Sequence, residues 1–243
     1  MSGRYRLALL AALVLLASGA CAETLPLPPN LTDLSSEQGE QYFLESDAHA
    51  AYFPIVANFV TQKTQAYCGV ASMVMVLNAL GAPAPSTPEY LPYRMFTQDN
   101  LLDERSDAVL PRDVLGRQGM TLDQLGGLLA LQGVAVELHH AEDGGLDAFR
   151  AAARAALAGR DRFVIVNYLR RAIGQQVGGH ISPLGAYDSR ADRFLVLDVA
   201  RYKYPPVWVA APDLYAAMNT VDPVNQGKTR GWVLVARGAA PAQ

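Results

Sequence analysis

The chain has 243 residues, and 51% of them are hydrophobic, so it can bury a full core in one or two domains. Its formal charge of −3 provides no basic field, which argues against a general affinity for nucleic acid. Acidic and basic residues are scattered along the chain, as on an ordinary solvated surface, and we find no internal repeat.

The N-terminus has the three-part pattern of an export signal. Two arginines in MSGRYR precede the apolar run LALLAALVLLA, which is too short to span a membrane, and the small residues SGACA follow. ACA before Glu23 fits a cleavage site, whereas LASGAC resembles an imperfect lipobox in which Cys21 would be lipidated. We therefore expect residues 1–22 to be a signal peptide, and the protein to be exported as a periplasmic protein or membrane-anchored lipoprotein of a bacterium.

The two cysteines leave three interpretations of Cys68. It could be a small buried side chain, half of a disulfide with Cys21, or a nucleophile. If Cys21 is lipidated or removed with the signal, Cys68 has no intramolecular partner. A lone cysteine in an exported protein indicates a reactive thiol, although free cysteines are also among the most buried residues.

Helices are predicted mainly in the first half of the chain. After the spacer LPLPPN, SSEQGEQYFLES indicates a short capped helix. In the segment 68–80, Val70, Val74 and Leu77 have helical spacing, and Gly81 ends the helix. A long, turn-rich stretch covers residues 83–112. TLDQLGGLLALQG begins with a capping-box pattern, and GLDAFRAAARAALAG is an Ala-rich helix.

Strands are predicted mainly in the second half. Runs rich in β-branched and aromatic residues follow a first candidate, VAVEL, and they are RFVIVNYL, HISPLGAY, RFLVLDVA and GWVLVA. One small helix, APDLYAAMN, interrupts them. This order predicts an α+β fold in which the helix that begins at Cys68 packs on an antiparallel sheet.

The position of Cys68 favours catalysis. The dipole and unpaired N–H groups of a helix N-terminus stabilise a thiolate, and the same N–H groups can form part of an oxyanion hole. Gln62 could donate its side-chain amide as a second group of that hole. Gln65, which is nearer in sequence, is the main rival for this role.

One of four histidines should be the base. We expect His49 to have no evident partner, and His139 and His140 to lie in a solvated turn. If the cluster DSRAD joins the strands on either side, positions whose numbers sum to about 380 face each other. His180 and Asp198 nearly satisfy this sum, and side chains that face across an antiparallel pair are roughly 4.5–5.5 Å apart at Cβ. Together with Cys68 they form a candidate catalytic triad.

The order Cys, His, acid, with a glutamine before the cysteine, resembles papain-like cysteine peptidases. The finer resemblance is to the phytochelatin synthase family. QAYCGVASMVMVLNAL resembles its nucleophile segment, GGHISPLGAYD its histidine segment, and FLVLDVARYKYPPVWV its acid segment. AMNTVDP and TRGWVLV resemble the block that closes its catalytic domain. The resemblance runs from about residue 44 to residue 235.

This resemblance implies a papain-like fold with Cys68, His180 and Asp198 as the triad and Gln62 at the oxyanion hole. It also implies a glutathione γ-glutamylcysteinyltransferase that cleaves the Cys–Gly amide of glutathione through a γ-Glu-Cys acyl-enzyme. Short bacterial relatives favour hydrolysis, so we expect mainly glycine and γ-Glu-Cys, with some phytochelatin synthesis and heavy-metal detoxification. Asp222 and Arg230 match the block thought to hold the γ-glutamyl end.

The sequence departs from the plant members, which have further cysteines. No Cys/His cluster has metal-ligand spacing, so we expect no metal site and no cofactor, and cadmium would arrive as a glutathione thiolate complex. The expected partners are glutathione and its metal complexes, with no nucleic acid and no membrane contact beyond an anchor at Cys21. A homodimer is left open.

The expected domain organisation is a signal peptide (1–22), an N-terminal extension (23–43), a catalytic domain (44–237) and a tail (238–243). Two other functions stay open at this point. One is a papain-like peptidase that acts on α-linked peptides. The other is a non-catalytic lipoprotein that binds thiols or metals.

Overall fold

The structure is a computed structural model that describes residues 24–238, so the predicted signal peptide and Cys21 lie outside the described residues. The helices are α1 (Glu37–Glu45), α2 (Tyr52–Val56), α3 (Cys68–Leu80), η1 (Pro88–Tyr90), α4 (Glu104–Asp107), α5 (Arg112–Gln118), α6 (Leu122–Ala130), η2 (Ala141–Asp143), α7 (Leu146–Leu157), η3 (Arg170–Ile173) and α8 (Ala211–Met218). The strands are β1 (Thr32–Asp33), β2 (Ala135–His140), β3 (Arg162–Leu169), β4 (Gly179–Asp188), β5 (Arg193–Val196), β6 (Val207–Ala210) and β7 (Gly231–Ala236).

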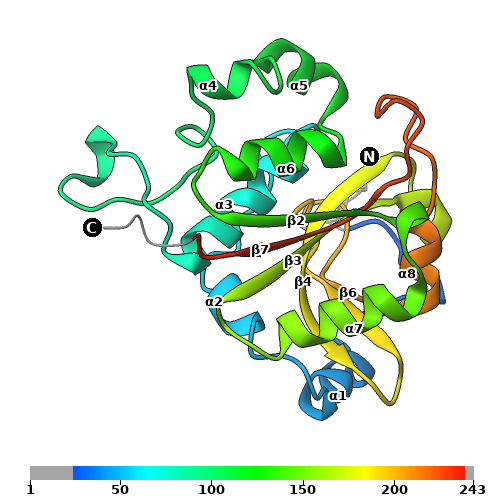
Figure 1. The fold of residues 1–243 in the computed structure, drawn as a ribbon. Helices are drawn as coiled ribbons and strands as arrows, with labels where there is room; N and C mark the ends of the chain where they lie inside the picture. The colour runs from blue at the N-terminus through cyan, green and yellow to red at the C-terminus, as the bar shows by residue number, and fades with distance from the viewer. Residues whose placement is uncertain (1–23, 239–243) are drawn as a thin grey trace, which may run out of the picture.

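A seven-stranded sheet with the order β1-β6-β5-β4-β3-β7-β2 forms the centre of the fold, and every pair in it is antiparallel. Helices α3 and α6 pack on one face, while α7 and α8 cover the other (Figure 1). The central strands β3 and β4 are therefore buried on both faces, whereas the edge strand β2 alternates between exposed and half-buried residues. The α+β prediction is confirmed.

Helix α3 has the predicted bounds, and local chemistry accounts for both ends. Its last residue is followed by Gly81 at φ 64°, a left-handed conformation that glycine adopts without steric cost. Its side chains are almost all buried, including those on the side away from Val70, Val74 and Leu77. The helix is thus enclosed in the core and holds its first residue, Cys68, in a fixed position.

The hairpin between β4 and β5 has nearly the predicted register. Leu184 faces Val196, a pair whose numbers sum to the expected value, and a bulge near Gly185 shifts the pairing by one residue toward the turn. Beyond the ladder, Leu197 N–H donates to the Pro183 carbonyl at 2.9 Å. The same register therefore continues toward His180 on β4 and toward Asp198, which follows Leu197.

The N-terminal residues belong to the same body as the rest of the chain. Strand β1 is the edge strand next to β6, and the indole N–H of Trp208 in β6 donates to the Gly39 carbonyl in α1 at 3.0 Å. The boundary that we predicted at residue 44 lies inside helix α1. The segment 24–43 thus contributes to the sheet and its covering layer.

Candidate active site

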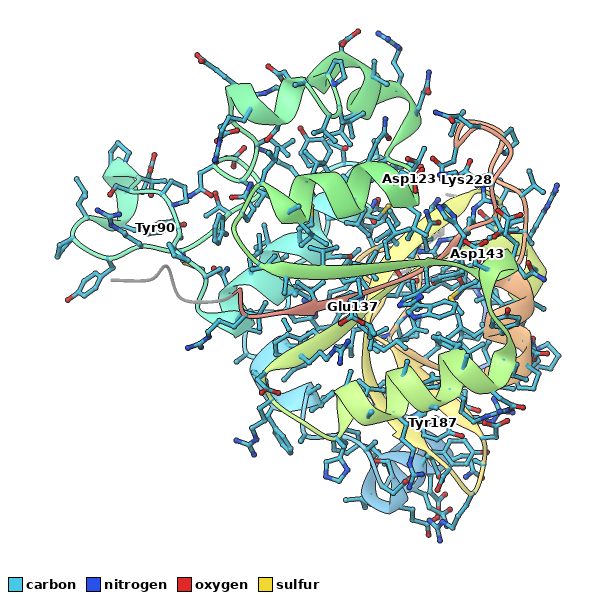
Figure 2. All side chains as sticks on the ribbon, in the orientation of Figure 1. Tyr90, Asp123, Glu137, Asp143, Tyr187 and Lys228 are labelled. Atoms are coloured by element: carbon cyan, nitrogen blue, oxygen red, sulfur yellow. The ribbon has the colours of Figure 1, made fainter. Side chains whose placement is uncertain are left out.

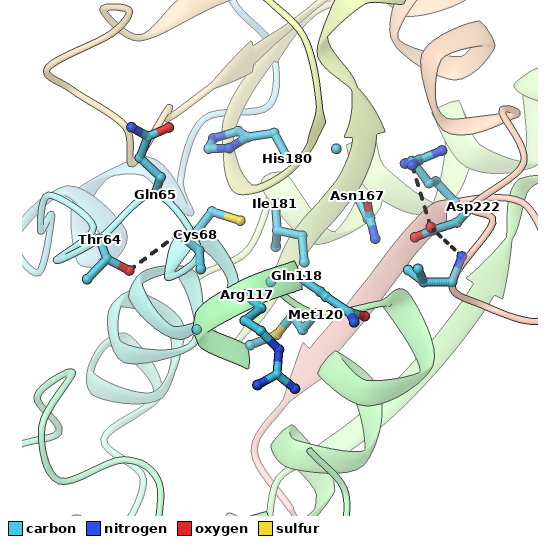
Figure 3. A pocket seen from close by; sticks show the side chains of 16 residues that line it. Thr64, Gln65, Cys68, Arg117, Gln118, Met120, Asn167, His180, Ile181 and Asp222 are labelled. Carbon is cyan, nitrogen blue, oxygen red and sulfur yellow. Dashed lines mark hydrogen bonds and ion pairs between the residues drawn. The ribbon is translucent and has the colours of Figure 1, made fainter. Parts of the chain in front are cut away.

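Cys68 is the first residue of α3 and lines a cavity of about 350 Å³. Its side chain is only 7% exposed, and its thiol points toward His180 (Figure 3). Tyr67, the N-cap residue, makes no side-chain hydrogen bond to the first turn. The main-chain N–H groups of that turn are therefore free to stabilise negative charge near the sulfur.

His180 in β4 lies between the thiol and Asp198. Its Nε2 contacts the Asp198 Oδ1 at 2.9 Å and the Ser182 Oγ at 2.9 Å, which leaves Nδ1 for the thiol. Asp198 follows β5 and is fully buried. The structure thus brings together Cys68 and the two residues that the hairpin count predicted, in the order thiol, imidazole, carboxylate.

The electrostatics of this group favour a thiolate–imidazolium pair. Burial alone would raise the pKa of the Cys68 thiol, but the hydrogen bond and charge of His180, the Ile181 main chain and the charge of Arg170 together lower it below the ordinary value. Burial opposes the charged form of His180, yet the Asp198 carboxylate outweighs it and raises the pKa of the imidazole. Asp198 itself keeps its charge, because the cations beside it overcome the effect of burial and lower its pKa.

Two residues near the triad were not found by sequence reasoning. Ser182 lies two residues after His180 on the same strand, so the side-chain alternation of a strand could have placed both on one face. Arg170 forms an ion pair with Asp198 at 2.7 Å and is 3% exposed. Its place in the short helix η3 carries no periodic signal that connects it with Asp198.

Gln62 and Gln65 have different surroundings, and only Gln65 is among the residues that line the cavity. The buried Gln62 donates from Nε2 to the Thr64 carbonyl at 2.7 Å and to the Tyr202 hydroxyl at 3.0 Å, so both amide protons have acceptors. Gln65 lines the cavity beside the thiol (Figure 3). The assignment of Gln62 to the oxyanion hole stays a prediction, and it requires one of these two hydrogen bonds to be exchanged for the substrate oxygen.

Asp222 lies at the far end of the cavity from Cys68 (Figure 3), and Arg230, which also lines the cavity, is its ion-pair partner. Arg230 Nη2 is 3.6 Å from the Asp222 Oδ1, and both side chains are less than a tenth exposed. Arg230 Nη1 donates to Thr220 and Val221, but its buried Nε has no partner. This end of the cavity therefore offers one carboxylate and one incompletely used guanidinium.

Between the two ends, Asn167 in β3 presents its amide to the cavity (Figure 3). Asn167 pairs with Ile181 in the β4 ladder and with Gly231 in β7. It lies next to the histidine strand and next to the strand that follows Arg230. Sequence reasoning did not single it out, because an asparagine inside a buried strand shows no motif of its own.

The other histidines lie outside this cavity. His49 contacts Ser46 through Nδ1 at 2.9–3.0 Å, so the expectation that it has no partner is wrong. The expectation of a solvated turn at His139 and His140 is also wrong, since both belong to β2. His140 is buried, with the Asp123 carboxylate at 2.8 Å from its Nε2, and Asp123 in turn pairs with Lys228 (Figure 2).

Residues 24–238 contain neither a membrane-spanning helix nor a metal-ligand cluster. None of the helices there has the length and apolar character needed to cross a bilayer. Nor does this part of the chain bring three histidine, cysteine or acidic side chains close enough together to hold a metal ion.

Comparisons with known proteins agree with this geometry. The family model described as phytochelatin synthase matches residues 22–232. The chain is 38% identical over 223 residues to glutathione gamma-glutamylcysteinyltransferase 1 of Lotus japonicus, covering 90% of this chain and 43% of the relative. It is 34% identical to the enzyme of the same name from Arabidopsis thaliana, with 88% and 43% covered, and 29% identical to the glutathione gamma-glutamylcysteinyltransferase of Schizosaccharomyces pombe, with 86% and 50% covered. The chain thus spans about half the length of these relatives.

Proposed function

Because this chain belongs to the phytochelatin synthase family, we propose that it cleaves the amide between cysteine and glycine in glutathione, γ-Glu-Cys-Gly. One observation carries the proposal: a single cavity is lined by Cys68 and His180 at one end and by Asp222 and Arg230 at the other. The first pair suits acyl transfer, and the second suits an amino-acid head group. Relatives named for γ-glutamylcysteinyl transfer support the choice of substrate.

In the first step, the Cys68 thiolate attacks the carbonyl carbon of the cysteinyl residue. Main-chain N–H groups at the start of α3 stabilise the oxyanion, with Gln62 as the proposed second donor. The C–N bond then breaks, and the imidazolium of His180 gives its proton to the departing amine of glycine. A thioester between the sulfur and the γ-Glu-Cys acyl group remains.

In the second step, His180 removes a proton from the attacking group, and Cys68 leaves as the thiolate. When the attacking group is water, the product is γ-Glu-Cys. When it is the amino group of a second glutathione, the product is the phytochelatin (γ-Glu-Cys)₂-Gly. We propose that hydrolysis dominates.

The remote end of the cavity selects the γ-glutamyl group. Its free α-ammonium needs an acceptor, which Asp222 supplies, and its α-carboxylate needs a donor, which the incompletely used guanidinium of Arg230 supplies. An α-linked peptide places its ammonium and side-chain carboxylate at different distances from the scissile amide. We therefore expect the cavity to favour glutathione over α-linked peptides, because it has suitable groups at both ends.

The test is mass spectrometry of products from purified protein incubated with glutathione or with the α-linked isomer α-Glu-Cys-Gly. We expect glycine and γ-Glu-Cys from glutathione, little product from the isomer, and no product with Cys68→Ser. Equal cleavage of the two isomers would instead indicate a peptidase. No release of glycine, or equal release by Cys68→Ser, would refute the proposal.

Metal and location complete the proposal. Cadmium and similar ions would enter as glutathione thiolate complexes and so act on the substrate, and a role in metal detoxification follows if added cadmium increases the phytochelatin fraction. Export rests on the sequence of residues 1–22, which is typical of a signal peptide. The mass of the mature N-terminus distinguishes cleavage before Glu23 from lipidation at Cys21, and an uncleaved Met1 would refute export.

A further inference from the structure

A buried arginine extends the triad by one residue. Arg170, at the start of η3, is 3% exposed, and it holds both oxygens of the Asp198 carboxylate. Nη1 lies 2.7 Å from Oδ2, and Nη2 donates to Oδ1 at 2.9 Å. This two-pronged geometry fixes the plane of the carboxylate, so that Oδ1 also faces His180.

The same side chain connects the acid to the segment that leads into the histidine strand. Its guanidinium donates to the Gln175 side-chain oxygen and lies over the Tyr204 ring, 5.2 Å from the centroid. Its main-chain N–H donates to the Gly178 carbonyl at 3.0 Å, just before β4. A displacement of Arg170 would therefore move the carboxylate and the start of the histidine strand relative to one another.

Charge gives Arg170 a second effect. With a thiolate, an imidazolium and an ionised Asp198, the triad has a net charge of −1 in a buried site. An unbalanced buried charge is costly, and the positive charge of Arg170 brings the total to zero. The charge of Arg170 lowers the pKa of both His180 and Cys68. Without Arg170, the Asp198 carboxylate would raise the pKa of His180 further.

We propose that Arg170 is a positioning residue of this site: it orients the Asp198 carboxylate and sets the pH range in which Cys68 and His180 are reactive. The inference rests on the proposed function only in taking Cys68 as the nucleophile.

The other groups around Arg170 do not replace it. Tyr168 in β3 lies edge-on to the His180 ring and is fully buried, so burial keeps its hydroxyl neutral by raising its pKa. Tyr204 offers only its ring face. Helix α8 packs against η3, and among the described residues its one charged side chain, Asp213, forms no ion pair with Arg170. The balancing cation next to Asp198 is therefore Arg170.

The experiment measures the pH dependence of Cys68 alkylation by iodoacetamide, which needs no substrate, together with kcat/KM for glutathione. Arg170→Met removes a cation next to two titrating groups, so we expect both limbs of the kcat/KM profile to move to higher pH. We also expect alkylation at pH 6 to become about tenfold slower. Arg170→Lys keeps the charge and should restore the pH of the limbs. Its kcat should still be below that of the wild type, because one ammonium cannot orient two oxygens.

A control is Arg150, whose guanidinium also holds both oxygens of an aspartate, Asp192, at 2.8 and 2.9 Å, and neither residue lines the cavity. Arg150→Met removes a pair of the same two-pronged geometry that is partly exposed, and we expect it to lower Tm and leave both pH profiles unchanged. If Arg170→Met is too unstable to assay, Arg170→Met/Asp198→Asn removes both charges and should melt above either single variant.

The outcomes are separable. A wild-type alkylation profile in Arg170→Met, or a double variant that melts below both single variants, would overturn the role of Arg170. A shifted alkylation profile in a protein that releases no glycine from glutathione would support Arg170 and refute the proposed function. Normal glycine release by the wild type, together with superimposable alkylation profiles of the wild type and Arg170→Met, would support the proposed function and refute the role of Arg170.

Discussion

Asp222 offers a quantitative test of how the substrate's γ-glutamyl group is recognised. Its carboxylate is 6% exposed and accepts one long hydrogen bond, from the Val224 N–H at 3.3 Å. The nearest guanidinium nitrogen of Arg230 is 3.6 Å away, which is beyond hydrogen-bond distance. Since an ionised carboxylate has about four acceptor positions, Asp222 has unused capacity directed into a cavity that it helps to line.

Asp222→Asn keeps the shape of this side chain and removes its charge. A hydrogen bond to a charged group is worth about 1.5–3 kcal/mol, so we expect kcat/KM for glutathione to fall roughly 10- to 150-fold. The loss should appear mainly in KM, because the ammonium is remote from the bond that breaks. Arg230 keeps the Thr220 and Val221 acceptors of its Nη1, so the variant should still fold.

The assay pairs the variant with glutaryl-Cys-Gly, which lacks only the α-amino group of glutathione. The wild-type enzyme should lose a similar factor on this analogue, whereas Asp222→Asn should treat the two substrates nearly alike. Asp213→Asn in α8, outside the cavity, is the control and should behave as wild type. If Asp222→Asn lost equal activity on both substrates, or lost none, the assignment of the ammonium to Asp222 would be refuted.

Three further predictions concern the nucleophile, the oxyanion hole and the sheet. Because the pKa of Cys68 is lowered and that of His180 is raised, the thiolate persists at pH values below the pKa of an ordinary thiol. His180→Ala should therefore slow Cys68 alkylation at pH 7 at least about tenfold, and an unchanged rate would exclude the ion pair. Gln62→Ala should lower kcat about 10²- to 10³-fold and leave alkylation unchanged, and a loss of less than tenfold would exclude it as an oxyanion donor. Gly231→Ala would place a Cβ 2.0 Å from a carbonyl oxygen of β2 and should cost about 1–3 kcal/mol of unfolding free energy in urea titrations, whereas unchanged stability would contradict the packing in this part of the sheet.

The sequence was most informative where a local rule determines the structure. Ser36 and Thr121 cap α1 and α6 as their side chains indicated, and Gly81 ends α3. The turn between β4 and β5 sets a register whose numbers sum to 380 at Leu184 and Val196, and two positions from that register the His180 and Asp198 side chains meet at 2.9 Å. Each of these rules acts over a few residues.

Long-range contacts decided what could not be predicted. β1 has two residues and exists only because β6 offers it an edge, so its own sequence carries no strand signal. His140 was expected in solvent because acidic residues follow it, but Asp123 and the Thr229 carbonyl satisfy it inside the fold. Arg170 belongs to the same class, since its partner is 28 positions away.

The most direct test of the central claim is to capture the acyl-enzyme. Protein mixed with glutathione and quenched in acid after a few milliseconds to seconds is digested, and the peptide that contains Cys68 is weighed. We expect an adduct on Cys68 whose mass equals one γ-Glu-Cys acyl group. Hydroxylamine should remove it, as expected for a thioester. Release of glycine with no adduct at Cys68 at any time, or with an adduct on another residue, would contradict this mechanism.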